Sequence, residues 1–583
     1  MNQVISIGKQ DFASLRESNA FYVDKTEFIR TWWEAQDDIT LITRPRRFGK
    51  TLNMSMLNCF YSLQYANRGD LFEELNIWKY EKYQKIQGTW PVIFLSFADV
   101  KQANAGDAIQ KIKKIIATVC HQFENILESD IFSESQRRQF ACIRPDMDDV
   151  TAQSALQDLS SYLFQYYGKK VILLLDEYDT PMQEAYIQGY WNEMSAFIRS
   201  LLNSSFKTNP YLERAMMTGI TRVSKESIFS DLNNLTVITT TSERYMDFFG
   251  FTEQEVFAAL DRFGMGGQKT AVKQWYDGFT FGTQRDIYNP WSITNFLKEK
   301  QLRPYWADTS SNGLISRLIQ KAPAEIKSSM EELLQGQAIE VNFDEQIVFE
   351  QLEQDENAIW SLMVASGYLK VEKVEYRGML LEPWYHLKIT NLETISMFSN
   401  MFRGWFRNSS SSYNGFVRAL LCGNIKEMNL YMNDVALATF SSFDTGAHPS
   451  EKTQPERFYY GFVLGLLVEL RDRYMVHSNR ESGYGRYDVM LIPKKKQDPA
   501  MILEFKVHDQ DAEETLQDTV AAALKQIQEK RYDAELLAQG LEEKQIHHYG
   551  FAFEGKRVMI GSLMNSSVEN KSTDELFLKK ILF

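Results

Sequence analysis

The stretch Arg44-Pro-Arg-Arg-Phe-Gly-Lys-Thr51 decides the fold of the N-terminal part of this chain. Residues 39–43, Ile-Thr-Leu-Ile-Thr, predict a short buried strand directly before it, and a helical pattern follows from Thr51 to about Tyr65. In this order of strand, loop and helix, backbone N–H groups and a helix N-terminus cradle phosphates. The sequence therefore predicts a phosphate-binding loop in which Gly49, Lys50 and Thr51 contact a nucleoside triphosphate and its Mg²⁺.

This loop departs from the usual pattern at its start. The pattern places a glycine at position 44, where Arg44 stands, and Pro45 lacks the N–H group that would donate to a phosphate. We therefore expect a loop of different shape, in which Arg46 and Arg47 supply positive charge.

A second half of the nucleotide site is expected at the aliphatic run 171–175, which ends in Asp176-Glu177. Asp176 would hold Mg²⁺ through water, and Glu177 would polarise the attacking water. Another probable strand ends in Thr218-Gly-Ile-Thr-Arg222, where Arg222 could reach the terminal phosphate. A charged residue at a strand end without such a role is the alternative interpretation.

The segments around these motifs predict an α/β domain over residues 1–250. Strands are expected near 92–97, 214–220 and 235–240, and helices near 107–125 and 182–204. Strands that alternate with helices indicate a mostly parallel sheet covered on both faces.

A helical middle region is expected over residues 251–440. Thr252 and Glu255 have the spacing of a capping box, and Trp275-Tyr-Asp-Gly278 and Tyr288-Asn-Pro-Trp291 predict aromatic-rich turns between helices. Residues 357–390 predict a helix followed by a hairpin around Arg377-Gly378, an order that resembles a winged-helix element. The polar segment 441–454 is a plausible domain boundary.

The C-terminal part predicts a second site, on two strands at 487–493 and 499–507. If the loop between them closes symmetrically, Asp488 lies opposite Glu504, and Lys506 projects from the same face of the sheet. Carboxylate oxygens suit Mg²⁺ or Mn²⁺, which lowers the pKa of a bound water, and Lys506 would orient or activate that water.

Composition limits the possible partners. The formal net charge of -13 over 583 residues argues against an extended nucleic-acid-coating surface, although a local basic track is compatible with it. The four cysteines lie too far apart for a metal-binding pattern. Since the sequence shows neither a signal peptide nor an apolar run of membrane-spanning length, we expect a soluble cytoplasmic protein without a membrane partner. Assembly into a homo-oligomer stays open.

Residues 1–65 and 170–235 resemble a bacterial and archaeal family of predicted AAA-like ATPases. The resemblance rests on Tyr22-Val-Asp-Lys-Thr26, on the loop 44–51 and on Asp176-Glu-Tyr-Asp-Thr-Pro181, and it extends through the two aromatic turns. Family members share the arginine in place of the first glycine. The resemblance therefore implies that this departure is compatible with ATP binding.

Residues 445–555 resemble the nuclease-like domain of the PD-(D/E)XK superfamily that is usually fused to such ATPases. The resemblance implies a restriction-endonuclease-like α/β domain over 441–583, with Asp488, Glu504 and Lys506 as its core. It also implies an acidic position at Glu456, on an expected helix 455–470, and a site-contacting position at Gln526. A structural ion pair in a nuclease-derived fold is the alternative.

Together these features predict a protein that binds and hydrolyses ATP and whose Mg²⁺-dependent nuclease domain cleaves nucleic acid, with DNA favoured over RNA, under ATP control. Defence against mobile DNA is a setting suggested by analogy alone. The alternative hypothesis is an ATP-switched signalling or scaffold protein whose nuclease-like domain binds nucleic acid or a partner without cleaving it. A motor that translocates along DNA is a third hypothesis.

Overall fold

In the computed structural model, the stretch before the phosphate loop forms β1 (Ile39–Thr43), and every residue of this strand is buried. It lies between two parallel neighbours in a sheet with the order β2-β3-β4-β1-β5. Parallel strands put their carboxyl ends at one edge, which is where α/β sheets bind ligands. The other strands of this sheet are β2 (Val92–Ser96), β3 (Val171–Asp176), β4 (Leu212–Gly219) and β5 (Leu235–Ile238).

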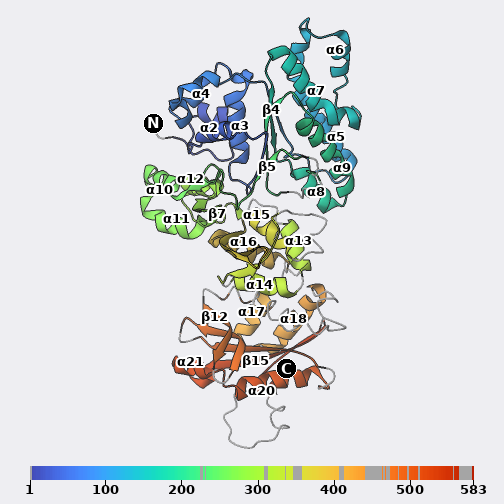
Figure 1. The fold of residues 1–583 in the computed structure, drawn as a ribbon. Coiled ribbons are helices and arrows are strands. Elements are labelled where there is room, and N and C mark those ends of the chain that lie inside the picture. Colours follow the sequence, from blue (N-terminus) through green and yellow to red (C-terminus); the bar gives the residue numbers. More distant parts are fainter. Residues whose placement is uncertain are drawn as a thin grey trace, which may run out of the picture. The chain divides into compact units, whose positions relative to one another are not determined.

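The structure describes residues 3–222, 228–229, 232–307, 313–322, 324–334, 336–345, 357–405, 413–439, 463, 467, 470, 473–482, 485–495, 498–509, 513–555, 557–563 and 581–582. They form two compact units (Figure 1): unit 1 comprises residues 1–318 and 336–396, and unit 2 comprises residues 319–335 and 397–583. No helix in the described part of the chain is long and apolar enough to cross a membrane.

Helices cover both faces of the unit 1 sheet, as predicted for a parallel sheet. Figure 1 shows α2, α3 and α4 on one side of the strands and α5, α7 and α9 on the other. The helical sequence predicted at 182–204 is divided between two helices, because Gly189 adopts φ 84° and ends the first of them. The helices of this layer are α1 (Phe12–Glu17), α2 (Glu27–Ala35), α3 (Lys50–Tyr61), α4 (Glu81–Ile86), α5 (Ala105–His121), α6 (Glu134–Phe140), α7 (Asp149–Tyr167), α8 (Thr180–Gln188) and α9 (Trp191–Leu202).

The rest of unit 1 combines short helices with two small sheets, β6-β8-β7 and β10-β11-β9. The capping box predicted at Thr252 and Glu255 begins α10, and the predicted hairpin around Arg377-Gly378 joins β10 to β11. The elements from here to the end of α16 are β6 (Phe251–Thr252), α10 (Glu253–Arg262), α11 (Lys269–Tyr276), β7 (Phe279–Phe281), β8 (Gln284–Tyr288), α12 (Pro290–Glu299), α13 (Gly313–Lys321), α14 (Ala324–Leu334), β9 (Ile339–Val341), α15 (Ala358–Ala365), β10 (Leu369–Arg377), β11 (Glu382–Ile389) and α16 (Leu392–Trp405). Among them, α14, the end of α13 and the later part of α16 belong to unit 2.

Unit 2 contains a mixed sheet with the order β12-β13-β14-β15-β16-β17, in which β14 and β15 run parallel. Its two faces carry separate apolar cores. Successive residues of β14 alternate between them, so Ile502 packs toward α20 and Leu503 toward α17 and α18. The elements are α17 (Tyr413–Leu421), α18 (Ile425–Thr439), β12 (Tyr474–Ser482), β13 (Gly485–Pro493), β14 (Ala500–Val507), α20 (Leu516–Glu529), α21 (Ala534–Ala538), β15 (Ile546–Glu554), β16 (Arg557–Leu563) and β17 (Ile581–Leu582).

Candidate active sites

The phosphate loop joins β1 to α3, and its backbone has the geometry of an anion-binding turn. Gly49 is the N-cap of α3 with φ 81°, and Arg47 also adopts a left-handed conformation with φ 67°. The ammonium group of Lys50, which is 5% exposed, donates to the carbonyl oxygens of Arg44 and Pro45, each at 2.8 Å. Burial lowers the pKa of Lys50, whereas the nearby carboxylates of Glu177 and Asp176 raise it. A helix N-terminus and a lysine in one loop form a donor set that fits phosphate groups.

Arg44, which stands where the usual pattern has its first glycine, stabilises the loop through buried contacts. Its side chain is fully buried and donates to the carbonyl oxygens of Thr43 at 2.9 Å and Thr239 at 2.6 Å. The guanidinium also lies 4.6 Å from the ring centroid of Phe281. Burial lowers the pKa of Arg44 to about 9. These contacts give the physical basis for the altered loop shape that the sequence predicted.

The aromatic turn Tyr288-Asn-Pro-Trp291 contacts Arg46 and Arg47 of the phosphate loop. The guanidinium of Arg47 lies 4.3 Å from the Trp291 ring, and the amide of Asn289 donates to the Arg46 carbonyl at 3.3 Å. Asn289 is fully buried and also caps α12 by accepting from the N–H of Trp291 at 2.9 Å. The motif therefore contacts the phosphate loop directly, although more than 230 residues separate them.

Two further segments complete the contacts to the loop. The Phe48 ring packs against Phe279 with centroids 4.8 Å apart and against Phe281 at 5.4 Å. Gly367 leaves room for Pro45, because a Cβ at Gly367 would lie 2.8 Å from Cγ of Pro45. The loop clamp, as we name these downstream residues, consists of Phe279, Phe281, Asn289, Trp291 and Gly367.

Asp176, at the end of β3, contacts both the first turn of α3 and the strand β4. Its carboxylate accepts from the hydroxyl of Thr51 at 2.8 Å and from that of Thr218 at 2.5 Å, and the residue is 1% exposed. Burial raises the pKa of Asp176, and the two hydroxyl contacts lower it. Thr51 and Asp176 thus meet as the sequence motifs predict for an Mg²⁺ site, and their oxygen donors suit that ion.

Glu177 and Arg222, two further predicted residues of this site, are less constrained by contacts. Glu177 adopts φ 51°, a strained conformation for a residue other than glycine, and accepts from the hydroxyl of Thr180 at 3.2 Å. Arg222 follows Thr221 and is half-buried. It forms no hydrogen bond or ion pair with another described residue, so its role at the phosphate stays a prediction.

Sequence reasoning missed the role of Asp179. This carboxylate is 1% exposed and accepts from the backbone N–H groups of Ile220 at 2.9 Å and Thr221 at 2.8 Å. Gly219 permits the approach, since a Cβ there would lie 2.7 Å from Asp179 Oδ1. Burial raises the pKa of Asp179. Asp179 therefore connects the segment after β3 to the segment after β4 through hydrogen bonds. The Asp176-Glu-Tyr-Asp179 motif was the sequence signal that could have indicated this role.

The second candidate site lies where β13 and β14 pair in unit 2. Val489 lies opposite Leu503 in an antiparallel register, so the next residues in this register are Asp488 and Glu504. One carboxylate oxygen of Asp488 accepts from the N–H of Phe505 at 2.8 Å. Glu504 is 3% exposed, and the side-chain amide of Gln526 donates to it. The carboxylate pair is a donor set that fits Mg²⁺ or Mn²⁺.

Gly550 explains how α20 reaches this carboxylate. Glu504 lies beside Gly550 in the parallel register of β14 and β15. A Cβ at Gly550 would lie 2.8 Å from the Val520 carbonyl oxygen and 3.0 Å from Cγ of Leu524, so α20 packs directly on this glycine. Gln526 is further held by its contact with the Tyr532 hydroxyl at 3.1 Å. Sequence reasoning identified Gln526 and missed Gly550.

The remaining residues predicted for the second site differ in how far the structure places them. Lys506 is half-buried and, two residues beyond Glu504 on β14, belongs to the face covered by α20. The expected helix at 455–470 is mostly, and Glu456 entirely, outside the described residues. Asp488, Glu504 and Gln526 are thus brought together, Lys506 shares their face, and the position of Glu456 stays a prediction.

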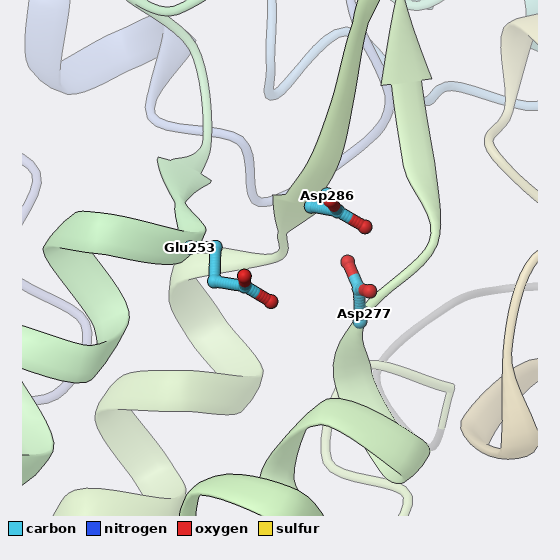
Figure 2. A group of neighbouring side chains, drawn as sticks. All are labelled: Glu253, Asp277 and Asp286. Carbon is cyan, nitrogen blue, oxygen red and sulfur yellow. The ribbon is translucent and has the colours of Figure 1, made fainter.

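An acidic cluster in unit 1 was not predicted. Figure 2 shows Glu253 on α10, Asp277 after α11 and Asp286 on β8, whose carboxylate oxygens lie within 4.8 Å of one another. The ammonium group of Lys273 contacts Glu253 and lies 3.7 Å from Asp286 and 3.9 Å from Asp277. Burial and the neighbouring Asp286 raise the pKa of Asp277 to about 7. The positive charge of Lys273 offsets part of the repulsion among the three carboxylates. The cluster therefore connects α10, the end of α11 and β8.

Two family models match separate parts of the chain. Residues 6–229 match a family model described as Predicted AAA-ATPase, and residues 454–563 match the model of the PD-(D/E)XK nuclease superfamily. An uncharacterized protein in the vnfD 5′ region of Azotobacter chroococcum mcd 1 is 25% identical over 580 residues, which cover 96% of this chain and 99% of that protein. The chain therefore carries an N-terminal segment similar to the predicted AAA-ATPases and a C-terminal segment similar to the PD-(D/E)XK nuclease superfamily.

Proposed function

We propose that the protein binds and hydrolyses ATP with Mg²⁺ and that its C-terminal domain cleaves phosphodiester bonds of nucleic acid, most readily DNA, under the control of the nucleotide. The observation that carries the proposal is the contact of Thr51 with Asp176 beside Lys50, together with the positions of Asp488 and Glu504 directly next to the Val489–Leu503 pair of β13 and β14. Each pair unites oxygen donors of the type that Mg²⁺ prefers.

At the nucleotide site, Lys50 would exchange its two carbonyl contacts for contacts with the β- and γ-phosphates. Thr51 would ligate Mg²⁺ directly, and Asp176 would hold it through water. Glu177 would polarise the water that attacks the terminal phosphate. The hydroxyl of Thr218 keeps the Asp176 carboxylate in place for this role.

At the nuclease site, Asp488 and Glu504 would hold Mg²⁺ or Mn²⁺. The bound ion lowers the pKa of a water molecule and stabilises charge on the phosphate. Lys506 would orient that water, and Gln526 fixes the Glu504 side chain through its amide. Glu456 is proposed as a further acidic member from its sequence position alone.

The loop clamp supports nucleotide control. Ser292, directly after Trp291, donates its hydroxyl to the fully buried Glu393 at 2.8 Å, and Glu393 also accepts from the Trp306 N–H at 2.6 Å. Glu393 lies in the first turn of α16, the helix in which the chain passes from unit 1 to unit 2. A change of the phosphate loop can thus act on the segment that leads to the nuclease domain.

The test is cleavage of single-stranded DNA, double-stranded DNA and RNA with Mg²⁺ or Mn²⁺, with and without ATP. We expect metal-dependent cutting that Asp488→Ala abolishes and that responds to ATP in the wild type but not in Lys50→Ala. If ATP binds through Lys50 and no substrate is cut, the ATP-switched signalling or scaffold function replaces the nuclease. Molar mass measured with and without ATP tests for a homo-oligomer, and phage infection of cells carrying the Asp488→Ala variant tests a role in defence against mobile DNA.

A further inference from the structure

A small pocket opens beside the phosphate loop. Its lining includes Arg46 from the loop, Gln183 from α8, Ile220 and Thr221 after β4, and Trp306 and Tyr368 from the later part of unit 1. Three of these residues, Gln183, Ile220 and Thr221, donate to Asp179, which follows β3. Arg46 therefore shares a cavity with residues that follow β4 and that contact Asp179.

The three arginines of the loop have different surroundings. Arg44 is buried beneath the loop on the carbonyl oxygens of Thr43 and Thr239, and Arg47 stacks on Trp291 at the outer surface. Arg46 is half-buried, and its positive charge is close enough to lower the pKa of Lys50. Among these arginines, Arg46 alone lines the pocket at the strand ends.

We infer that Arg46 stabilises the terminal phosphoryl group during ATP hydrolysis and that it acts within its own chain. This inference rests on the proposed ATPase function and adds to it the residue that supplies transition-state charge. In the reaction, the water oxygen bonds to the γ-phosphorus, and the bond from that phosphorus to the β–γ bridging oxygen breaks. ADP leaves with the bridging oxygen and its electron pair, and the proton of the water passes to Glu177 and then to solvent.

The loop geometry supports this role for Arg46. Lys50 contacts the loop from α3, and the Arg46 carbonyl is held by the Asn289 amide. Two cations at a transferring phosphoryl group offset the negative charge that spreads over its oxygens. An arginine in this position typically accelerates hydrolysis about 10³- to 10⁵-fold.

The first experiment compares Arg46→Ala and Arg46→Lys with the wild type. We expect kcat for ATP hydrolysis to fall about 10³-fold in Arg46→Ala, while the Kd for ATP changes only a few-fold. Arg46→Lys should remain slow, because lysine lacks the planar fork of donors. Binding of ADP with aluminium fluoride, which mimics the transferring group, should weaken far more than binding of ADP alone. The retained affinity for ATP shows that the variant is folded.

Arg138→Ala is the control, because this exposed arginine on α6 forms an ion pair with Glu134 and lies outside the phosphate loop. Arg222→Ala tests the rival arginine. Arg138→Ala should keep kcat within a few-fold of the wild type. If Arg222→Ala causes the large loss of kcat and of aluminium fluoride binding while Arg46→Ala does not, the inference is overturned and Arg222 takes the role.

A mixing experiment decides whether Arg46 acts within its own chain. Arg46→Ala keeps the ATP-binding lysine, and Lys50→Ala keeps Arg46, so a mixture regains activity only if Arg46 reaches the site of another subunit. We expect no recovery at any ratio and a specific activity of the wild type that is independent of protein concentration. Recovery would overturn action within one chain. A wild type that hydrolyses no ATP would end both the ATPase proposal and this inference, whereas an active Arg46→Ala would end only the inference.

Discussion

Gly550→Ala should loosen the helix that reaches the candidate nuclease site. The added Cβ would lie 2.8 Å from the Val520 carbonyl oxygen, and ordinary contact begins at 3.4 Å, so α20 has to retreat by the difference of about 0.6 Å. Backbone atoms form this contact, so a change of rotamer cannot relieve it. Overpacking of this kind costs about 1–3 kcal/mol.

Hydrogen exchange measures this effect whether or not the domain is an active enzyme. A cost of about 1–3 kcal/mol corresponds to a roughly five- to 150-fold increase in exchange from the amides of α20, if they exchange by local opening. Cleavage should also fall, by about tenfold or more, because catalytic groups must be held within about 0.5 Å of their working positions. The loss would follow from displacement of Gln526 away from Glu504.

Gly415→Ala is the control in the same unit, because its Cβ would meet no atom closer than 3.5 Å and its backbone is helical. Its exchange should be unchanged or slower, since alanine favours a helix by about 0.5–1 kcal/mol over glycine. Wild-type exchange and cleavage in Gly550→Ala would refute the reasoning, because they would show that α20 does not pack on Gly550 as described.

Three other predictions concern unit 1. Asp277→Asn should raise the melting temperature more at pH 8 than at pH 5. The pKa of Asp277 is about 7 in the folded protein and near 3.9 in the unfolded chain, so ionisation of this carboxyl destabilises the fold increasingly as pH rises. Asp261→Asn, at an exposed ion pair, is the control. Trp291→Ala should weaken ATP binding about two- to fivefold in calorimetry by freeing Arg47, whereas Trp384→Ala, at a similar stack with Arg377, should not. Thr218→Val should slow ATP hydrolysis about tenfold and raise the Mg²⁺ concentration it requires, because a buried carboxylate loses a donor; equal Mg²⁺ requirements would contradict this reasoning.

The sequence predicted the parts of the fold that depend on local pattern. The aliphatic runs that become β1 and β3, the capping box at Thr252 and the hairpin at Arg377-Gly378 all follow from neighbouring residues. The opposition of Asp488 and Glu504 was also predictable, because a short loop between two strands restricts their register. The exact lengths of α8 and α9 were not predicted, although Gly189 was a visible break.

The parts that sequence reasoning missed depend on contacts between distant segments. Nothing near Gly550 indicates that a helix will lie on it, and nothing near Asp277 indicates the approach of Glu253 and Asp286. The sequence shows that Arg44 stands where a glycine is usual. It does not show that the Arg44 side chain is buried against Phe281, because that contact joins segments far apart in the sequence. Such contacts have no sequence periodicity, so a single sequence carries little signal for them.

The loop clamp also affects when the nucleotide site can form during synthesis. Lys50 leaves the ribosome early, but Trp291, Gly367 and the buried Glu393 follow only after roughly 240 to 340 further residues. At about 5–20 residues per second, a nascent chain has an unclamped phosphate loop for roughly 10 to 70 seconds. The candidate nucleotide site is therefore completed late, when the segment that leads to the nuclease-like domain is already being made, and a bound nucleotide could stabilise the chain only from that moment.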